Sequence, residues 1–260
     1  MLNKKLPKLI IAGPCVVESR ELLFEVAGEI KPVCDELGIK FVFKSSYRKA
    51  NRTSEASFEG IGDRVALSCI ADVKEKYGVE VLTDVHSVSE VEMASEFVDV
   101  LQIPAFLSRQ SDILRAAGRT GKTVNIKKGQ FMAAEDILKA AEKVSSTGND
   151  KIWLTERGTS FGYHDLIVDF RTLVFLGQNK YPVIYDATHS LQQPSLGEQS
   201  GGLPLYIKPL AKAAAAVGVD GLFFETHPDP KAAKSDSATQ LPLADAVSFI
   251  REINKIWNVI

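Results

Sequence analysis

Eight short apolar segments, each followed by a stretch of helical periodicity, constrain the fold of this chain more than any other feature. Most are apolar on both faces, which is typical of parallel strands buried on two sides, since half-exposed antiparallel strands alternate apolar and polar residues. The segments are KLIIAG near residue 8, IKFVFK near 39, VEVLTD near 79, VDVLQI near 98, KTVNIK near 122, KIWLTE near 151, PVIYD near 182 and DGLFFE near 220.

The stretches between these segments carry apolar residues at helical spacing. Examples are Leu22, Leu23, Val26, Ile30 and Val33, then Val65, Ile70 and Val73, and finally Ala246, Ile250, Ile253 and Trp257. Strand and helix therefore alternate through all 260 residues, with no Gly/Ser-rich linker and no internal repeat. This pattern predicts one α/β domain over residues 1–260, a single closed (β/α)8 TIM barrel, with a doubly wound open sheet as the alternative.

Composition and charge exclude several classes of function. The net charge is −2 and the pI is near 6.1, so we expect no nucleic-acid partner. The apolar run before Gly13 is too short for a signal peptide or a membrane span. Three cysteines, at 15, 34 and 69, form no even framework. We therefore expect reduced thiols, a cytoplasmic location and no membrane partner.

Reactive or charged residues follow almost every predicted strand at its C-terminal end. In a barrel these ends meet at one mouth, where barrel enzymes hold their active sites. Any one of these residues has an ordinary alternative as a solvated loop residue, but eight in register favour a site. They are Cys15, Lys44, Asp84 with His86, Gln102, Lys127, Arg157, His189 and Glu225.

Seven basic residues lie at or just after strand ends in a slightly acidic protein. Clustered cations repel one another, so this arrangement indicates a strongly anionic ligand, such as two phosphates and a carboxylate. Arginine provides a planar fork for phosphate and lysine a point charge. The alternative is a set of ion pairs with carboxylates. The seven are Lys44, Lys49, Arg52, Arg109, Lys127, Lys128 and Arg157.

Four potential metal ligands are far apart in the sequence: Cys15, His189, Glu225 and Asp236. The barrel would place the first three on neighbouring strands. A thiolate, an imidazole and two carboxylates suit a divalent transition metal, Mn, Fe, Co or Zn, rather than calcium. Each residue also has another reading: a buried apolar cysteine, a core histidine, carboxylates paired with lysines, or a Cys15–His189 nucleophile pair.

The segments around these residues resemble the 3-deoxy-manno-octulosonate 8-phosphate synthase family from about residue 9 to residue 243. The matching strings are GPCVVES (13–19), FKSSYRKANRTS (43–54), TDVH (83–86), IPAFLSRQSD (103–112), NIKKGQF (125–131), TERGTSFGY (155–163), YDATHSLQ (185–192), SGG (200–202), ETHPDP (225–230) and SDSATQLPL (235–243). The resemblance implies condensation of phosphoenolpyruvate with arabinose 5-phosphate and water, a step toward lipopolysaccharide. It also implies a homotetramer, and Cys15 is typical of the metal-dependent branch.

The resemblance assigns roles to individual residues. A catalytic set of Lys127, His86, Asp236 and Lys49 is expected, with His86 and Asp236 as proton carriers. Arg109 is expected to reach the phosphate in a neighbouring subunit. The residues expected to bind phosphoenolpyruvate are Lys44, Ser46, Lys49, Gln102, Ala105, Lys127 and Arg157. The residues expected to bind the sugar phosphate are Asn51, Arg52 and Thr53.

Two alternative functions stay open, and the sequence departs from the family pattern at two places. The alternatives are the related synthase that uses erythrose 4-phosphate, which typically has Lys-Pro-Arg where this chain has Lys-Ala-Asn-Arg, and a noncatalytic phosphosugar-binding barrel. The first departure is Arg48, where an acidic residue is common. The second is LPLYIKPLA at 203–211, where an arginine is more usual.

Overall fold

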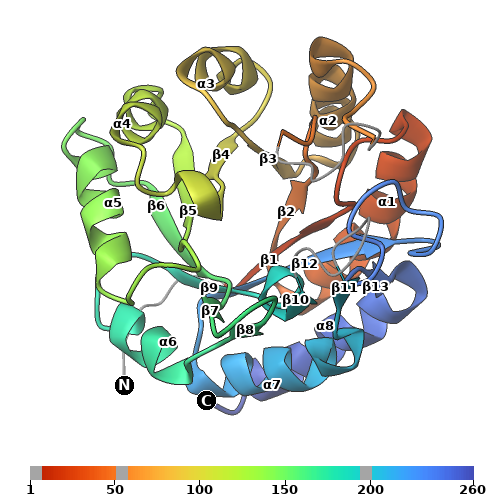
Figure 1. Ribbon diagram of the computed structural model, residues 1–260. Helices are drawn as coiled ribbons and strands as arrows, with labels where there is room; N and C mark the ends of the chain where they lie inside the picture. Colours follow the sequence, from red (N-terminus) through yellow and green to blue (C-terminus); the bar gives the residue numbers. More distant parts are fainter. Residues whose placement is uncertain (1–7, 51–57, 194–200) are drawn as a thin grey trace.

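A computed structural model describes residues 8–50, 58–193 and 201–260. Within these ranges, parallel strands form a closed ring in the order β1-β2-β3-β4-β5-β6-β9-β12, and β12 pairs back onto β1 (Figure 1). The ring strands are β1 (Leu9–Gly13), β2 (Lys40–Lys44), β3 (Glu80–Asp84), β4 (Val100–Ile103), β5 (Thr123–Lys127), β6 (Ile152–Glu156), β9 (Val183–Asp186) and β12 (Gly221–His227). The predicted (β/α)8 barrel is confirmed, and the open sheet is excluded by the β1–β12 pairing.

Helices surround the ring and connect one strand to the next (Figure 1). Their boundaries follow local signals: Ser19 caps the first helix by accepting from the Leu22 N–H at 3.2 Å, and Gly38 ends it in the left-handed region, with a φ of 65°. The helices are α1 (Arg20–Leu37), α2 (Asp63–Tyr77), α3 (Val88–Ser95), α4 (Ser111–Arg119), α5 (Asp136–Ser145), α6 (Phe170–Gly177), α7 (Ile207–Val217) and α8 (Leu243–Trp257).

Two apolar cores stabilise the barrel. The larger lies between the ring and the helices, where the apolar stripes of α1 and α8 are buried. The smaller fills the interior of the ring and consists of Leu9, Ile11, Val42, Leu82, Val100, Ile184 and Phe223. Because apolar side chains fill this part of the interior, the polar side chains at the strand ends lie above a close-packed apolar layer.

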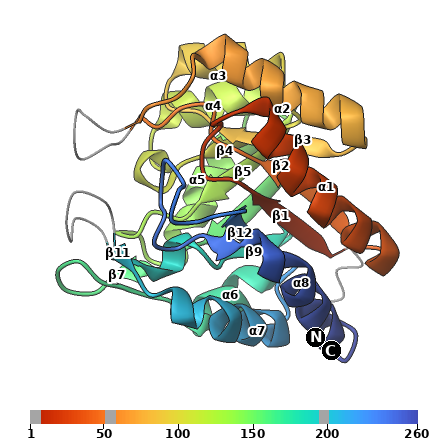
Figure 2. The same ribbon diagram turned by 90° about the vertical axis from the view of Figure 1, so that its right-hand side faces the viewer.

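Several short elements lie at the end of the barrel formed by the C-terminal ends of the strands. They include the pairs β7 (Thr159–Ser160) with β8 (Leu166–Ile167) and β10 (Gln192–Gln193) with β11 (Gly201–Gly202). β13 (Leu241–Pro242) extends alongside β12. Three 3-10 turns complete the set: η1 (Ala105–Leu107), η2 (His189–Leu191) and η3 (Pro204–Tyr206). Figure 2 shows β7 and β11 at the end of the barrel opposite the chain's C-terminus.

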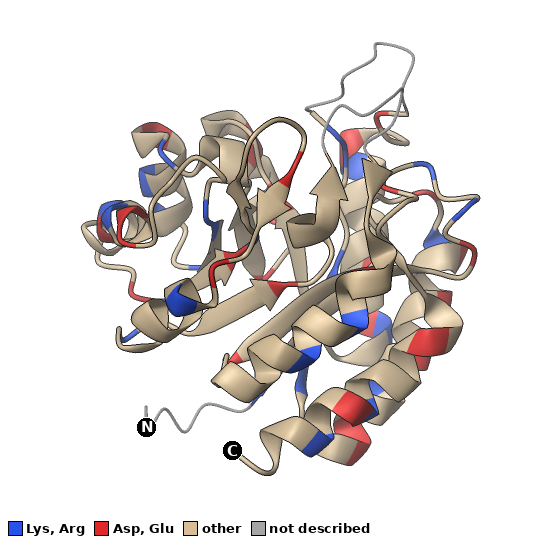
Figure 3. Ribbon diagram, turned by 60° about the horizontal axis from the view of Figure 1, so that its bottom comes forward, with Lys and Arg blue, Asp and Glu red and all other residues tan. Residues whose placement is uncertain are grey.

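Charged residues of both signs are interspersed along the outer helices in the view of Figure 3. This distribution agrees with the small net charge of −2. Among the described residues, no helix combines the length and the apolar composition needed to cross a bilayer.

Candidate active site and metal centre

The barrel brings the strand-end residues to one mouth. Lys44, Lys127 and Glu225 lie at or near the ends of β2, β5 and β12, and their side chains are buried. Cys15 follows β1, separated by Pro14 from Gly13, the last residue of that strand. A Cβ atom at position 13 would lie 2.0 Å from the carbonyl oxygen of Lys44. Glycine at this position therefore allows the ends of β1 and β2 to approach closely.

All four predicted metal ligands meet in this mouth. The sulfur of Cys15 and carboxylate oxygens of Glu225 and Asp236 lie within 4.8 Å of one another. His189, in η2, places its Nε2 atom 3.7 Å from Glu225 Oε1 and 4.0 Å from Asp236 Oδ2. The four side chains come from the loop after β1, from η2, from β12 and from the loop that follows β12.

This donor set fits a transition metal ion. Glu225 is fully buried, and its Oε2 atom has no hydrogen-bond partner among the described residues. A buried carboxylate oxygen without a partner is costly, and a cation would satisfy it. Thiol, imidazole and carboxylate donors together match the preferences of Mn, Fe, Co or Zn.

The protonation of Cys15 depends on its charged neighbours. Burial, followed by the negative charges of Asp236 and Glu225, holds the pKa of the Cys15 thiol well above its usual value, although Lys49 and Lys44 act in the opposite direction. The thiol sulfur lies 3.0 Å from Asp236 Oδ2. A divalent cation among these groups would reverse the balance, because a metal binds the thiolate.

Asp236 reaches Cys15 from an unusual backbone conformation. Its φ is 47°, in the left-handed region that residues other than glycine rarely adopt. The neighbouring Ser235 also approaches Cys15, with Oγ 3.0 Å from the thiol sulfur. Such strain costs on the order of 1 kcal/mol and is common at functional sites. The loop after β12 is therefore held in a conformation that directs Asp236 at the other potential metal ligands.

The lysines near the metal ligands are partly paired. Lys44 Nζ donates to Glu225 Oε1 at 2.6 Å and to the Cys15 carbonyl oxygen at 3.0 Å. Lys49 Nζ lies 3.9 Å from Asp236 Oδ2. Burial would lower the pKa of Lys49, but Cys15, Glu225 and Asp236 outweigh it and raise this pKa above its usual value. Lys49 therefore stays a cation.

Lys127 has a partner that the sequence analysis did not single out. Its Nζ atom lies 2.5 Å from Oδ2 of Asp186, a fully buried residue at the end of β9. The same Oδ2 atom lies 2.9 Å from His189 Nδ1. The available signal was the position of Asp186 as another polar residue that ends a predicted strand, three residues before His189.

Arg157 is a buried cation in the mouth. It follows β6, its side chain is buried, and its Nη2 atom donates to Gln192 Oε1 at 3.2 Å. Its Nη1 atom is buried without a hydrogen-bond partner among the described residues. Burial lowers the pKa of Arg157, although Asp186 and Glu156 oppose this effect. An anion placed here would satisfy the free donor.

The ion-pair alternative for the basic residues therefore holds in part. Lys44 and Lys127 face buried carboxylates, and Lys128 lies 3.6 Å from Glu156 Oε2 on β6. Lys128 also donates to Thr159 Oγ1 at 3.0 Å, so it supports the start of β7. Arg157 differs from these three lysines because no carboxylate of the described residues lies within ion-pair distance of its guanidinium, and its buried Nη1 atom has no partner among them.

The remaining phosphoenolpyruvate candidates line the same mouth. Ser46 Oγ donates to Asp84 Oδ1 at 2.5 Å, and His86 Nε2 lies 3.2 Å from Asp84 Oδ2. Gln102 Oε1 accepts a hydrogen bond from Asn125 at 3.0 Å. Ala105 is buried at the start of η1.

Arg48, the first departure from the family pattern, has acidic partners. Its guanidinium donates to Glu90 Oε1, and its Nη1 atom lies 3.4 Å from Asp63 Oδ2. Glu90, a mostly buried residue of α3, also accepts from the hydroxyl of Tyr47 and lies 2.8 Å from His86 Nδ1. The second departure, residues 203–211, forms η3 and the start of α7, where Ile207 and Ala211 are buried.

The structure does not bring every predicted residue into this mouth. Asn51, Arg52 and Thr53 lie outside the described residues. Arg109 is exposed after η1, and its positive charge acts on Asp136 at the start of α5 rather than on the buried carboxylates.

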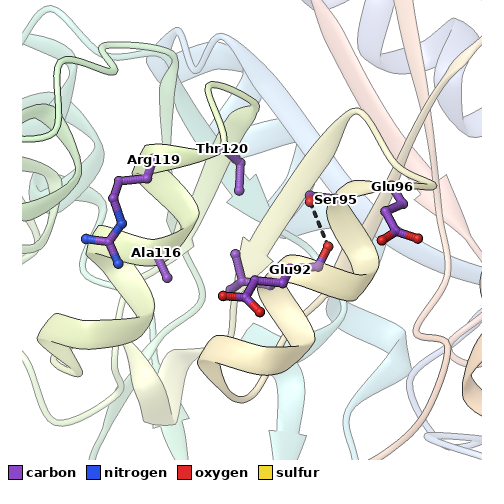
Figure 4. Close-up of a pocket in the computed structure, with 7 residues that line it drawn as sticks. Glu92, Ser95, Glu96, Ala116, Arg119 and Thr120 are labelled. Carbon is purple, nitrogen blue, oxygen red and sulfur yellow. Dashed lines mark hydrogen bonds between the residues drawn. The ribbon is translucent and has the colours of Figure 1, made fainter.

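A second hollow, of about 390 Å³, lies between α3 and α4 (Figure 4). The later turns of both helices line it, so it faces away from the strand ends, and none of the predicted site residues takes part. Its lining consists of Val91, Glu92, Ser95, Glu96, Ala116, Arg119 and Thr120.

Comparison with known proteins gives a consistent result. The DAHP synthetase I family matches residues 3–258. A 2-dehydro-3-deoxyphosphooctonate aldolase of Magnetococcus marinus is 51% identical over 252 residues, which are 96% of this chain and 88% of that protein. Proteins of the same name from Syntrophotalea carbinolica and Granulibacter bethesdensis are each 49% identical over 251 residues, 96% of this chain and 91% and 89% of their own lengths.

Proposed function

Because the chain belongs to the DAHP synthetase I family, and within it to the 2-dehydro-3-deoxyphosphooctonate aldolases, we propose that it condenses phosphoenolpyruvate with D-arabinose 5-phosphate and water. The products are 3-deoxy-D-manno-octulosonate 8-phosphate and inorganic phosphate. The reaction is an aldol-type transfer with C–O cleavage, and its product serves lipopolysaccharide biosynthesis.

The observation that carries this proposal is the buried cation cluster beside the potential metal ligands. Arg157 has a buried donor without a partner, and Lys127 shares a single carboxylate oxygen with His189. Phosphoenolpyruvate carries a phosphate and a carboxylate, which supply the acceptors that these donors lack. Ser46, Gln102 and Ala105 would line the same pocket.

In this proposal Lys127 and Arg157 hold phosphoenolpyruvate with its C3 atom facing the sugar aldehyde. The electrons of the C2–C3 double bond form the new carbon–carbon bond, while the π electrons of the aldehyde move to its oxygen, which takes a proton. Water adds at the electron-poor C2 and loses a proton. The C2–O bond to phosphate then breaks, and phosphate leaves with the bonding pair. His86 and Asp236 would carry the protons, and the cationic Lys49 would stabilise developing negative charge.

The metal would be held by Cys15, His189, Glu225 and Asp236, and Mn, Fe, Co and Zn are all candidates. When bound, it would supply Lewis acidity that orients and polarises the water or the aldehyde. The side chains that face it also include Lys44, whose ammonium donates to Glu225 and holds that carboxylate in the ionised form. The pKa of Glu225 is lowered, because the ammonium groups of Lys44 and Lys49 outweigh the opposing effect of burial.

The sugar phosphate would bind at Asn51, Arg52 and Thr53, with Arg109 contributed by a neighbouring subunit. The support for a shared site is the exposure of Arg109 on a loop that also exposes Phe106. We accordingly propose a homotetramer. Residues 1–260 would form one catalytic barrel domain, and the three free, buried cysteines suit the reducing cytoplasm.

The experiment is phosphate release from phosphoenolpyruvate by the purified protein, with arabinose 5-phosphate and erythrose 4-phosphate compared as acceptors. We expect release with arabinose 5-phosphate and at most slow release with erythrose 4-phosphate. A preference for erythrose 4-phosphate would assign the chain to the heptulosonate synthases. No release with either sugar, despite a full metal complement, would leave a noncatalytic binding protein.

A further inference from the structure

Asp186 is a buried carboxylate with no role in the chemistry described above. Both of its oxygens are fully engaged: Oδ1 accepts from the backbone N–H groups of Thr188 at 3.0 Å and His189 at 2.9 Å. Oδ2 lies 2.5 Å from Lys127 Nζ and 2.9 Å from His189 Nδ1. One side chain therefore faces the backbone of η2, the imidazole of His189 and the ammonium of Lys127.

This geometry selects one tautomer of His189. Two groups lie near His189 Nδ1: Asp186 Oδ2 at 2.9 Å, which needs a proton on this nitrogen, and Lys127 Nζ at 3.3 Å, which needs a lone pair there. The carboxylate is the nearer of the two and the ammonium already donates to it, so we assign the proton to Nδ1. The lone pair then belongs to Nε2, which faces Glu225 and Asp236. A carboxylate behind a metal-binding histidine fixes its orientation and strengthens it as a ligand.

The same carboxylate oxygen fixes Lys127. The ammonium lies between Asp186 and the ring of Phe223, whose centroid is 3.6 Å from Nζ. The ring of His189 packs on the same phenylalanine, at a centroid distance of 5.7 Å. Lys127 and His189 therefore both contact the ring of Phe223 and the carboxylate of Asp186.

We propose that Asp186 is a positioning residue that sets His189 for metal binding and Lys127 for phosphoenolpyruvate binding at the same time. The assignment of ligands to the two partners rests on the proposed function. Asp186 itself would touch neither the metal nor the substrate.

Asp186→Asn tests this with two binding measurements. If the amide oxygen still accepts hydrogen bonds from the backbone N–H groups of η2, the amide NH2 group faces Lys127 and His189 Nδ1. His189 must then carry its proton on Nε2, which blocks metal binding. We expect the Co(II) dissociation constant, followed by visible absorption, to rise about 10- to 100-fold. The dissociation constant for phosphoenolpyruvate, measured by calorimetry on chelator-treated protein, should rise about tenfold.

Asp220→Asn is the matched control, because Asp220 accepts from the Val183 N–H at 2.7 Å at the opposite end of β9. This variant should bind Co(II) and phosphoenolpyruvate like the wild type. If Asp186→Asn binds both ligands normally, or if Asp220→Asn weakens both equally, Asp186 has no positioning role. Thermal unfolding of both variants shows whether a loss of ligand binding comes from misfolding.

A measurement on the unaltered protein covers the case in which Asp186→Asn does not fold. With 15N-labelled histidine and bound Zn(II), NMR should show His189 protonated at Nδ1 and metal-bound through Nε2. His189→Gln identifies the signal. Protonation at Nε2 would overturn the proposal. A wild-type protein that releases no phosphate would instead overturn the proposed reaction and leave this tautomer result intact.

Discussion

At the residue scale, His86 shows how the mouth balances its charges. Its Nε2 atom lies 3.2 Å from Asp84, and its Nδ1 atom lies 2.8 Å from Glu90. Burial would lower the pKa of His86, but its hydrogen bonds with Asp84 and Glu90 raise it to about 9. The pKa of Glu90 is lowered to about 2, because its hydrogen bonds from His86 and Tyr47 outweigh burial. The imidazolium therefore bridges the end of β3 and the start of α3, and Ser46 and Tyr47 from the loop after β2 donate to the same two carboxylates.

His86→Gln should make stability less dependent on pH. A pKa raised in the folded state gives stability that is complete below the unfolded value of about 6.5 and is lost as the pH rises through about 9. We expect the variant to lose roughly 1–3 kcal/mol of unfolding free energy at pH 6 and much less at pH 10. Urea unfolding at both pH values measures this. An equal loss at pH 6 and pH 10 would contradict the charged bridge.

Substitution of Cys15 separates metal binding from turnover. Cys15→Ala should lose metal and activity together, since it removes a ligand and leaves nothing in its place. Cys15→Asn should also lose metal but keep turnover within about 100-fold of the wild type, because its amide can hydrogen-bond with Asp236 as the thiol does. Elemental analysis alongside phosphate release measures both. A fully active, metal-free wild-type protein would disprove the four-ligand assignment.

Sequence reasoning identifies residues better than it identifies their partners. Cys15, His189 and Glu225 were predicted to meet because strand order alone brings them together. Asp186 was not singled out, since its importance depends on the side chains that two other segments direct at it. Arg48 departs from the family pattern, where an acidic residue is common, and its partner Glu90 could not be predicted because it lies 42 residues away, on the helix after the next strand.

At the element scale, all eight predicted strands are present, since fully apolar segments with β-branched residues have few other places in a soluble fold. The helical stripes of α1 and α8 are buried as expected, whereas Val65 in α2 is 58% exposed. Two-residue strands such as β7 and β10 could not be predicted, because their pairing depends on tertiary contacts rather than on a sequence period.

Glu18 connects two of the loops that carry proposed metal ligands. It lies between β1 and α1, and its Oε1 atom accepts from the backbone N–H of Lys234 at 2.9 Å. The same oxygen lies 3.6 Å from Nε2 of His227, the last residue of β12. The loop with Cys15 therefore holds the loop with Asp236 through a contact outside the metal site.

Glu18→Ala should loosen the loop after β12 and weaken metal binding. We expect the Co(II) dissociation constant to rise about 3- to 10-fold and amide hydrogen exchange across residues 228–236 to become faster. Glu25→Ala, an exposed position on α1, is the control and should change neither. Unchanged exchange in the Glu18 variant would show that the loop needs no such tie.

At the scale of the whole molecule, exposed aromatic residues surround the mouth beside Arg109. Phe106, Phe131, Phe161 and Tyr163 lie on the loops after β4, β5 and β6 and are 53% to 95% exposed. Large exposed apolar side chains in one region are typical of contact with another subunit. This arrangement supports the proposal that Arg109 completes a neighbouring active site.

Mixing two inactive variants tests the shared site. Arg109→Ala and Arg157→Ala should each lose at least about 100-fold in activity, because each leaves an anionic substrate group unpaired. Hybrid tetramers would contain some sites with both arginines, so activity should partly return after subunit exchange. Native mass spectrometry confirms the exchange. Hybrids that form but remain inactive would place both arginines in the same subunit's site.

The proposed metal ligands also set an order of events during protein synthesis. Asp236 lies 221 residues after Cys15, and a ribosome adds about 5–20 residues per second. A growing polypeptide therefore displays the first ligand for roughly ten seconds or more before the last one exists. Metal binding by all four residues is consequently a late event that requires the first and last strands to have paired. An incomplete polypeptide therefore does not bind the ion at an incomplete site.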